Sequence, residues 1–110
     1  MLHILNVILS FVEDTGSLVP RIARHDPDLA RQLRRASTAV ALNTAEGSAA
    51  RGRSRAACYN IALREMRECH TALQIAVRLR YLPPLSTELE ARCQQILATL
   101  YKLSFPRAAA

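Results

Sequence analysis

Arginine is the residue type with the greatest capacity for chemistry in this chain of 110 residues. It makes up all but one of the fifteen basic residues, Lys102 being the exception, whereas Asp and Glu together total nine. A guanidinium group forms paired hydrogen bonds with phosphate or carboxylate groups. The formal net charge of +6 therefore predicts a nucleic acid or an acidic protein as partner. A GC-rich genome, which encodes arginine in preference to lysine, explains the same bias without any function.

Nine arginines are the candidate residues for binding nucleic acid or a partner, because few acidic residues are available to pair with them. Some belong to the basic stretch 47–55 and the others to two predicted helices, with a solvated surface as the alternative interpretation. The set is Arg31, Arg34, Arg35, Arg51, Arg53, Arg55, Arg64, Arg67 and Arg78. No aromatic residues alternate with them to stack on bases, so we expect phosphate-directed, sequence-tolerant binding to RNA or to DNA.

The histidines and acidic residues lack the spacing of a metal or catalytic site. Glu65, Glu68 and His70 are near one another, but Glu68 and His70 are two residues apart and point in different directions on a helix. No other helix supplies a matching pair for a di-iron site. The chain also has no Gly-x-Ser-x-Gly motif and no glycine-rich phosphate loop. We therefore expect no enzymatic activity, no metal and no cofactor.

The three cysteines, Cys58, Cys69 and Cys93, include no Cys-x-x-Cys pair. Cys58 and Cys69 share a helical face but are eleven residues apart, which is about 16 Å along a helix. That distance is too long for a disulfide. Buried free thiols in a reducing cytoplasm are the simplest interpretation.

Two polar residues of the second predicted helix, Asn43 and Glu46, lie on or beside its inward face. A polar group there needs a hydrogen-bond partner. They either form a ligand or subunit contact, or act as hydrogen-bond anchors between helices or to an arginine such as Arg35. We favour the second interpretation, in which both residues are structural.

We expect all these side chains to lie on or between helices. Ala, Leu and Arg, which favour helices, dominate the chain, and no Asn-Gly or Asp-Gly hairpin signal occurs. Asp26-Pro27 and the Thr87–Glu90 segment carry residue types with which helices begin. Apolar residues that recur every three or four positions predict helices over about 3–24, 26–50, 54–80 and 87–105. The expected fold is all-α, an up-down-up-down antiparallel four-helix bundle that forms one domain over residues 1–110.

Two segments should interrupt these helices. Pro20 cannot donate a hydrogen bond to the carbonyl of Gly16, so we expect a kink or break near residues 16–20, where Ser17 is able to cap a second piece. The small and basic residues from Gly47 to Arg55 predict a loop or a frayed corner, although Gly47 also continues the inward face of the second predicted helix.

The first twelve residues, MLHILNVILSFV, are apolar nearly all round the helix that they predict. They lack the basic start and cleavage site of a signal peptide and are too short to span a bilayer. We therefore expect a cytoplasmic protein without membrane association. Leu5, Val7, Leu9 and Val12 fall outside the core stripe, which predicts that a subunit interface covers part of this helix.

Several short motifs resemble the four-helix bundle proteins of the 23S rRNA intervening-sequence family, and the similarity covers most of the chain. They are Gln32-Leu33-Arg34-Arg35-Ala36, Val40, Asn43-Thr44-Ala45-Glu46-Gly47, Tyr59-x-Ile61-Ala62, Glu68 and Tyr81-Leu82. The chain departs from the family at Arg64-Glu65, where members often have Gly-Ser, and at Ala39, where serine is frequent. Close helix or subunit approach at Arg64-Glu65 is therefore in doubt.

The resemblance implies a left-handed, homo-pentameric bundle from a bacterium. The family is similar to the accessory proteins of diversity-generating retroelements, which are basic pentameric bundles that bind nucleic acid and a reverse transcriptase. A reverse transcriptase or the product of a neighbouring gene is thus an implied protein partner.

Together these observations predict a non-enzymatic homo-oligomer that binds nucleic acid or a nucleoprotein through its arginines. The alternative is a structural or protein-interaction scaffold, an accessory module that binds no nucleic acid.

Overall fold

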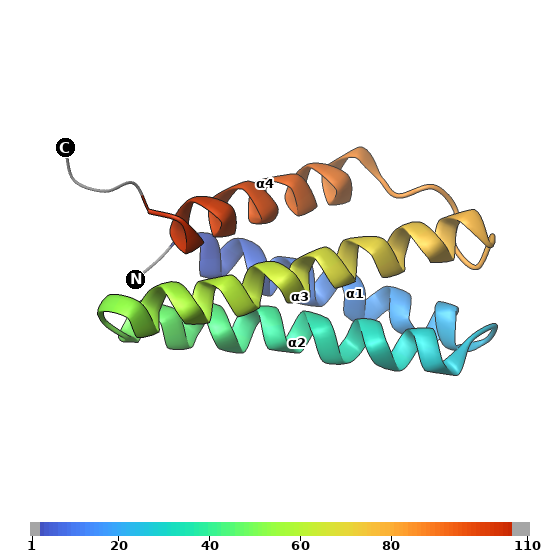
Figure 1. Ribbon diagram of the computed structural model, residues 1–110. Helices are drawn as coiled ribbons and strands as arrows, with labels where there is room; N and C mark the ends of the chain where they lie inside the picture. Colours follow the sequence, from blue (N-terminus) through green and yellow to red (C-terminus); the bar gives the residue numbers. More distant parts are fainter. Residues whose placement is uncertain (1–2, 107–110) are drawn as a thin grey trace.

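Four α-helices make up the computed structural model, which describes residues 3–106 (Figure 1). No strand occurs within that range. The helices are α1 (His3–Ala23), α2 (Pro27–Ala49), α3 (Gly52–Arg78) and α4 (Thr87–Ser104). The prediction of an all-α fold with four helices is thereby confirmed, with helix boundaries within about two residues of those expected from the sequence.

The helices pack around one shared core. α2 contacts both α1 and α3, and α4 contacts both α3 and α1. Figure 1 places the α1–α2 and α3–α4 connections at one end of the molecule and the α2–α3 connection at the other. The largest fully buried side chains include Phe11, Tyr59, Met66, Leu73 and Ile96, and they come from α1, α3 and α4.

Local side-chain hydrogen bonds begin two of the helices. Asp26 Oδ1 accepts from the backbone N–H of Leu29 at 3.0 Å, and Pro27 occupies the first turn of α2, as the sequence predicts. α4 begins at Thr87, in the segment that the sequence indicates, and its cap is the preceding residue: Ser86 Oγ accepts from the N–H of Leu89 at 3.0 Å. None of the helices described is both long enough and apolar enough to cross a membrane.

The predicted break near Pro20 is absent, since α1 runs without interruption from His3 to Ala23. Proline removes only one hydrogen bond, and Gly16, whose carbonyl loses that donor, is exposed to water. Buried residues on both sides, Thr15 and Ile22, hold the two halves of the helix against the core. The hydroxyl of Ser17 donates to the carbonyl of Asp14 at 2.8 Å and caps no second piece.

The predicted loop from Gly47 to Arg55 is much shorter in the structure, where only Ala50 and Arg51 lie between α2 and α3. Gly47 is a buried helical residue, and a Cβ atom there would lie 2.8 Å from the ring of Tyr59. The absence of a side chain at this position lets the aromatic ring pack against the α2 backbone. Packing between the two helices therefore overrides the loop-like composition of this stretch.

Candidate functional site

Three of the candidate arginines meet at the turn between α2 and α3, which we call the basic corner (Arg51, Arg53 and Arg55). Arg51 is the cap residue before α3, and the other two lie in the first turns of that helix. All three are exposed, and the first turn of α3 contains no acidic residue. Arg55 Nε donates to the carbonyl of Ala50 at 2.9 Å, which directs one guanidinium toward the negative end of the α2 dipole.

The start of α3 adds a second source of positive potential to the basic corner. Arg51 provides no side-chain hydrogen bond to the first-turn N–H groups, unlike Asp26 on α2 and Ser86 on α4. The first N–H groups of a helix have no intrahelical acceptor, and the helix dipole is positive at this end. The basic corner therefore presents guanidinium and backbone donors together, a combination that suits a phosphate group.

Two other candidate arginines are already paired with carboxylates. Arg31 forms an exposed ion pair with Asp28 at 2.8 Å, one turn earlier on α2. Arg35 bridges to α3, where its guanidinium contacts Glu65 at 2.9 Å and Glu68 at 2.8 Å. The hydrogen bonds that Arg35 donates to Glu68 and Glu65 raise the pKa of Arg35 above its ordinary value. Both arginines therefore have less capacity to bind an external anion.

The remaining candidates are exposed and spread along two helices. Arg34 lines a shallow groove between α1 and α2, and Arg67 lines one between α2 and α3. Arg64 and Arg78 also lie on the exposed surface of α3. No carboxylate pairs with these four side chains among residues 3–106. They form no single cluster like that of the basic corner.

Asn43 and Glu46 differ from the prediction that they anchor one helix to another. The side-chain amide of Asn43 donates to the carbonyl of Ala39 at 2.9 Å, within α2 itself. Glu46 is exposed, and Arg35 is bound by α3 residues instead. The polar residues that α2 does bury are Ser37 and Thr44, whose hydroxyls donate to the carbonyls of Arg34 at 3.1 Å and Val40 at 2.7 Å. The buried face of α2 is rotated slightly from the predicted inward face, and this rotation explains why Thr44 is buried there in place of Asn43 and Glu46.

The residues considered for metal binding have other partners. Glu68 pairs with Arg35, whereas His70 Nε2 lies 3.0 Å from a carboxylate oxygen of Glu90 on α4. Hydrogen bonds from Gln94 and then from His70 lower the pKa of Glu90 below its ordinary value. Within the described range, no three His, Cys, Asp or Glu side chains are grouped so as to hold a metal ion.

The cysteines are free thiols in different environments. Cys69 and Cys93 are fully buried, while Cys58 is half-buried, so the predicted burial holds for two of the three. Burial raises the pKa of Cys69 far above its ordinary value and raises the pKa of Cys93 to about 12. Neither buried thiol is poised to act as a nucleophile.

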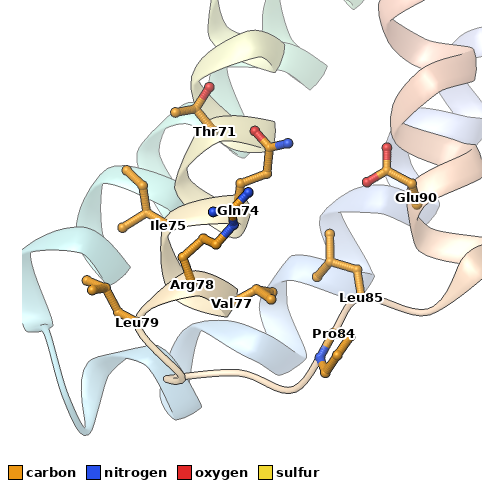
Figure 2. Close-up of a pocket in the computed structure, with 9 residues that line it drawn as sticks. All are labelled: Thr71, Gln74, Ile75, Val77, Arg78, Leu79, Pro84, Leu85 and Glu90. Atoms are coloured by element: carbon orange, nitrogen blue, oxygen red, sulfur yellow. The ribbon is translucent and has the colours of Figure 1, made fainter.

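The other end of α3 carries a feature that the sequence did not indicate as a site. An apolar groove with a volume of about 670 Å³ lies between the last turns of α3, the α3–α4 connection and Glu90 of α4 (Figure 2). Ile75 and Leu79 of α3 remain 41% and 55% exposed there. Both lie outside the inward stripe of the helix, which is the only signal in the sequence that could have marked them.

Comparison with known proteins identifies relatives of this chain. The family model of the 23S rRNA-intervening sequence protein matches residues 4–102. A crystal structure of a protein with unknown function from the S23 ribosomal protein family of Bacteroides thetaiotaomicron VPI-5482 is similar, with a TM-score of 0.78 and 20% sequence identity. The alignment covers 92% of this chain and 97% of that one. No curated protein matches the chain.

Proposed function

This chain belongs to the 23S rRNA-intervening sequence protein family, and from that premise we propose that it is a non-enzymatic helical bundle that binds nucleic acid through its basic corner. The observation that carries the proposal is the concentration of Arg51, Arg53 and Arg55 beside an α3 N-terminus that has no side-chain cap. Each corner arginine is exposed and has no carboxylate partner among the described residues.

The chemistry of the basic corner favours contact with the phosphate backbone over contact with bases. Guanidinium groups and backbone N–H groups are phosphate ligands, and none of the aromatic residues lies in the stretch 47–55 to stack on bases. Such binding tolerates many sequences and includes both RNA and DNA. Arg34, Arg64, Arg67 and Arg78 extend the positive surface, whereas Arg31 and Arg35 contribute less because each already pairs with a carboxylate.

The proposal includes assembly into a homo-oligomer, a pentamer of up-down-up-down antiparallel bundles, in a bacterial cytoplasm. Large apolar side chains left on the surface support it, among them Leu9 at 46% and Leu42 at 65% exposure. Such residues are commonly covered in an interface between subunits. A symmetric assembly repeats the basic corner, so that one long polyanion contacts several copies and binds more tightly. The free cysteines suit a reducing compartment.

A salt titration tests the nucleic-acid proposal. Fluorescence anisotropy would follow single-stranded RNA, duplex RNA and duplex DNA of equal length, binding to the wild-type chain and to Arg51→Glu/Arg53→Glu. We expect the variant to bind about tenfold more weakly at low salt. Its slope of log K against log salt should fall by about 2, because neither substituted side chain can neutralise a phosphate group.

The matched control is Arg21→Glu/Arg24→Glu, which lowers the net charge by the same amount on exposed residues at the opposite end of the bundle. If both double variants lose affinity equally, net charge and not the basic corner drives binding. If the wild-type chain fails to bind any of the three nucleic acids at low salt, the alternative of a scaffold without nucleic-acid binding is correct.

Light scattering of the purified protein tests the assembly. A mass of five chains supports the pentamer, and a monomer contradicts it. The ratio of absorbance at 260 and 280 nm in the same sample reports nucleic acid that copurifies.

A further inference from the structure

We propose that the apolar groove at the C-terminal end of α3 is a docking site for an acidic amphipathic helix of another protein. The groove is distinct from the basic corner and lies at the opposite end of the same helix (Figures 1 and 2). The basic corner is centred on Arg53 and the α3 side of the groove on Ile75, so the two sites are about 33 Å apart along the helix axis. The inference therefore goes beyond nucleic-acid binding and does not depend on it.

The groove exists because α4 covers only part of α3. α3 continues to Arg78, while Pro83 and Pro84 delay the start of α4 to Thr87. An extended connection without helical structure takes the place of a neighbouring helix beside the last turns of α3, and its residues Pro84 and Leu85 form one wall. A helical neighbour is thus missing from one side of α3, and an external helix fits the space that remains.

The exposed apolar side chains of the groove are spaced so that an amphipathic helix lying alongside α3 can contact them. Ile75 and Leu79 are four residues apart on one side of α3, and Leu85 of the connection lines the other side of the groove, beyond Gln74 and Arg78 (Figure 2). Side chains at this spacing line one face of a helix, which is the pattern that receives apolar residues of a helix lying alongside. Covering Leu79, which is 55% exposed, removes apolar surface from water and favours docking.

The arginines around the groove specify the charge of the partner. Arg78 lines the groove itself, and Arg67 lines an adjoining groove that shares Thr71 and Ile75 with it. The two arginines are eleven residues apart, or about three helical turns and 16 Å. Neither has a carboxylate partner among residues 3–106. A helix with carboxylates at a similar separation would pair with both while its apolar face lies on Ile75.

The opposite wall carries one acidic group, Glu90, whose carboxylate is already engaged. It lies 3.0 Å from His70 Nε2 and accepts a hydrogen bond from Gln94 at 2.7 Å. These hydrogen bonds satisfy the carboxylate oxygens and favour the ionised form of Glu90, so this wall offers no attraction for an acidic partner. The side of the groove formed by α3 is therefore the side that selects an acidic partner.

A second copy of this chain is a poor occupant, because its acidic residues are mostly committed. Asp14 pairs with Arg92, Asp26 caps α2, and the remaining committed carboxylates have the partners described above. The three others, Glu13, Glu46 and Glu88, lie on α1, α2 and α4 and are widely separated in sequence. No single helix of the chain supplies two uncommitted carboxylates for Arg67 and Arg78.

Nucleic acid also fits the groove less well than it fits the basic corner. A phosphate backbone has no apolar side chains to cover Ile75, Leu79 and Leu85, which would stay exposed to water beside it. The basic corner, by contrast, offers its donors with no large aliphatic residue between Gly47 and Arg55. Acidic groups with apolar groups between them are the chemistry of a protein helix.

Fluorescence anisotropy with the full chain and a designed peptide tests the proposal. The labelled peptide has about 18 residues, or about five helical turns, with leucines at alternating three- and four-residue spacing and two glutamates separated as Arg67 and Arg78 are. A second peptide carries lysine in place of the two glutamates, and a third has the first composition in scrambled order. We expect saturable binding of the acidic peptide alone.

Variants of the groove assign the binding to its side chains. Leu79→Gln should weaken binding about tenfold by removing apolar contact. Arg67→Glu/Arg78→Glu should lower the affinity for the acidic peptide by a similar factor. The same variant should bind the lysine peptide, a rescue that unfolding cannot produce. Arg51→Glu/Arg53→Glu serves as the control and should keep full affinity for the acidic peptide, even if it no longer binds nucleic acid. Circular dichroism checks that each variant keeps its helical content.

Four results would overturn the proposal. They are equal binding of the acidic and scrambled peptides, equal binding of the acidic and lysine peptides, displacement of the peptide by RNA from Arg51→Glu/Arg53→Glu as readily as from wild type, and a smaller oligomer for Leu79→Gln by light scattering. The third would assign the groove to nucleic acid, and the fourth would assign it to a second copy of the chain.

Discussion

The two ends of α3 carry arginines in different surroundings. At the basic corner, Arg51, Arg53 and Arg55 stand among small residues beside an open helix start. At the apolar groove, Arg67 and Arg78 flank the exposed side chains of Ile75 and Leu79. The charge has the same sign at both ends, but only the groove adds apolar surface, which phosphate cannot cover and a protein helix can.

The difference between the basic corner and the apolar groove indicates that net charge by itself does not specify a partner. A charge of +6 attracts polyanions and acidic proteins alike, through a field that salt screens. A site for a polyanion differs from a site for an acidic protein in the surface between the charges and in the direction of the backbone donors. Arg35 of α2 is less available to either class of partner, because its guanidinium already pairs with Glu65 and Glu68.

The largest expected effect compares the reactivity of the thiol near the basic corner with that of the two thiols in the core of the bundle. Cys58, near the basic corner, is half-buried, whereas Cys69 and Cys93 are buried deeper in the bundle. A buried thiol reacts only after the structure opens, so we expect Cys69 and Cys93 to react about a thousandfold more slowly than Cys58. Titration with a chromogenic disulfide at pH 8 should find one fast thiol in the native protein and three in denaturant. Three fast thiols in the native protein would mean that the bundle opens readily.

Two glycine substitutions compare a packed position near the basic corner with an open position on α1. Gly47→Ala places a Cβ atom 2.8 Å from the ring of Tyr59 and should lower the free energy of unfolding by about 1–2 kcal/mol. Gly16→Ala meets nothing within 4 Å and should raise it by about 0.5–1 kcal/mol. Urea denaturation measures both. An increase for Gly47→Ala would show that the Tyr59 ring moves freely and that the corner is loosely held.

Helix caps compare the start of α3 with the start of α4. Arg51→Asp supplies the side-chain acceptor that α3 lacks and should raise the free energy of unfolding by about 1 kcal/mol, while weakening nucleic-acid binding. Ser86→Ala removes the acceptor from α4 and should lower the free energy of unfolding by about 1 kcal/mol without affecting nucleic acid. A nucleic-acid affinity unchanged in Arg51→Asp would argue against the basic corner as a phosphate site.

The smallest effect concerns the ion pairs that join α2 to α3 between the two ends. Arg35→Ala should lower stability slightly, because exposed ion pairs contribute little. The loss should shrink as salt rises, in contrast to the salt-independent loss in Gly47→Ala. Thermal unfolding at low and high ionic strength measures the difference. A salt-independent loss in Arg35→Ala would indicate that the stem of the side chain, and not its charge, stabilises the contact.

Features that depend on residues close together in the sequence could be predicted from the sequence alone. The four helices follow from apolar residues at three- and four-residue spacing, and Asp26-Pro27 marks the start of α2. Prediction failed where packing overrides local preference. α1 continues through Pro20, and α3 already begins at Gly52 within the basic stretch predicted as a loop, although proline and glycine commonly interrupt helices.

The sequence by itself determines the surplus of positive charge and the helices that carry the arginines, because composition and local periodicity contain that information. Only the tertiary structure decided which arginines remain available. Arg35 finds Glu65 and Glu68 thirty and thirty-three residues away, and that contact depends on how α2 is rotated against α3. The groove likewise arises because α4 leaves the last turns of α3 uncovered. The sequence shows that Ile75 and Leu79 lie outside the inward stripe, but which neighbouring segment covers them depends on packing between distant parts of the chain.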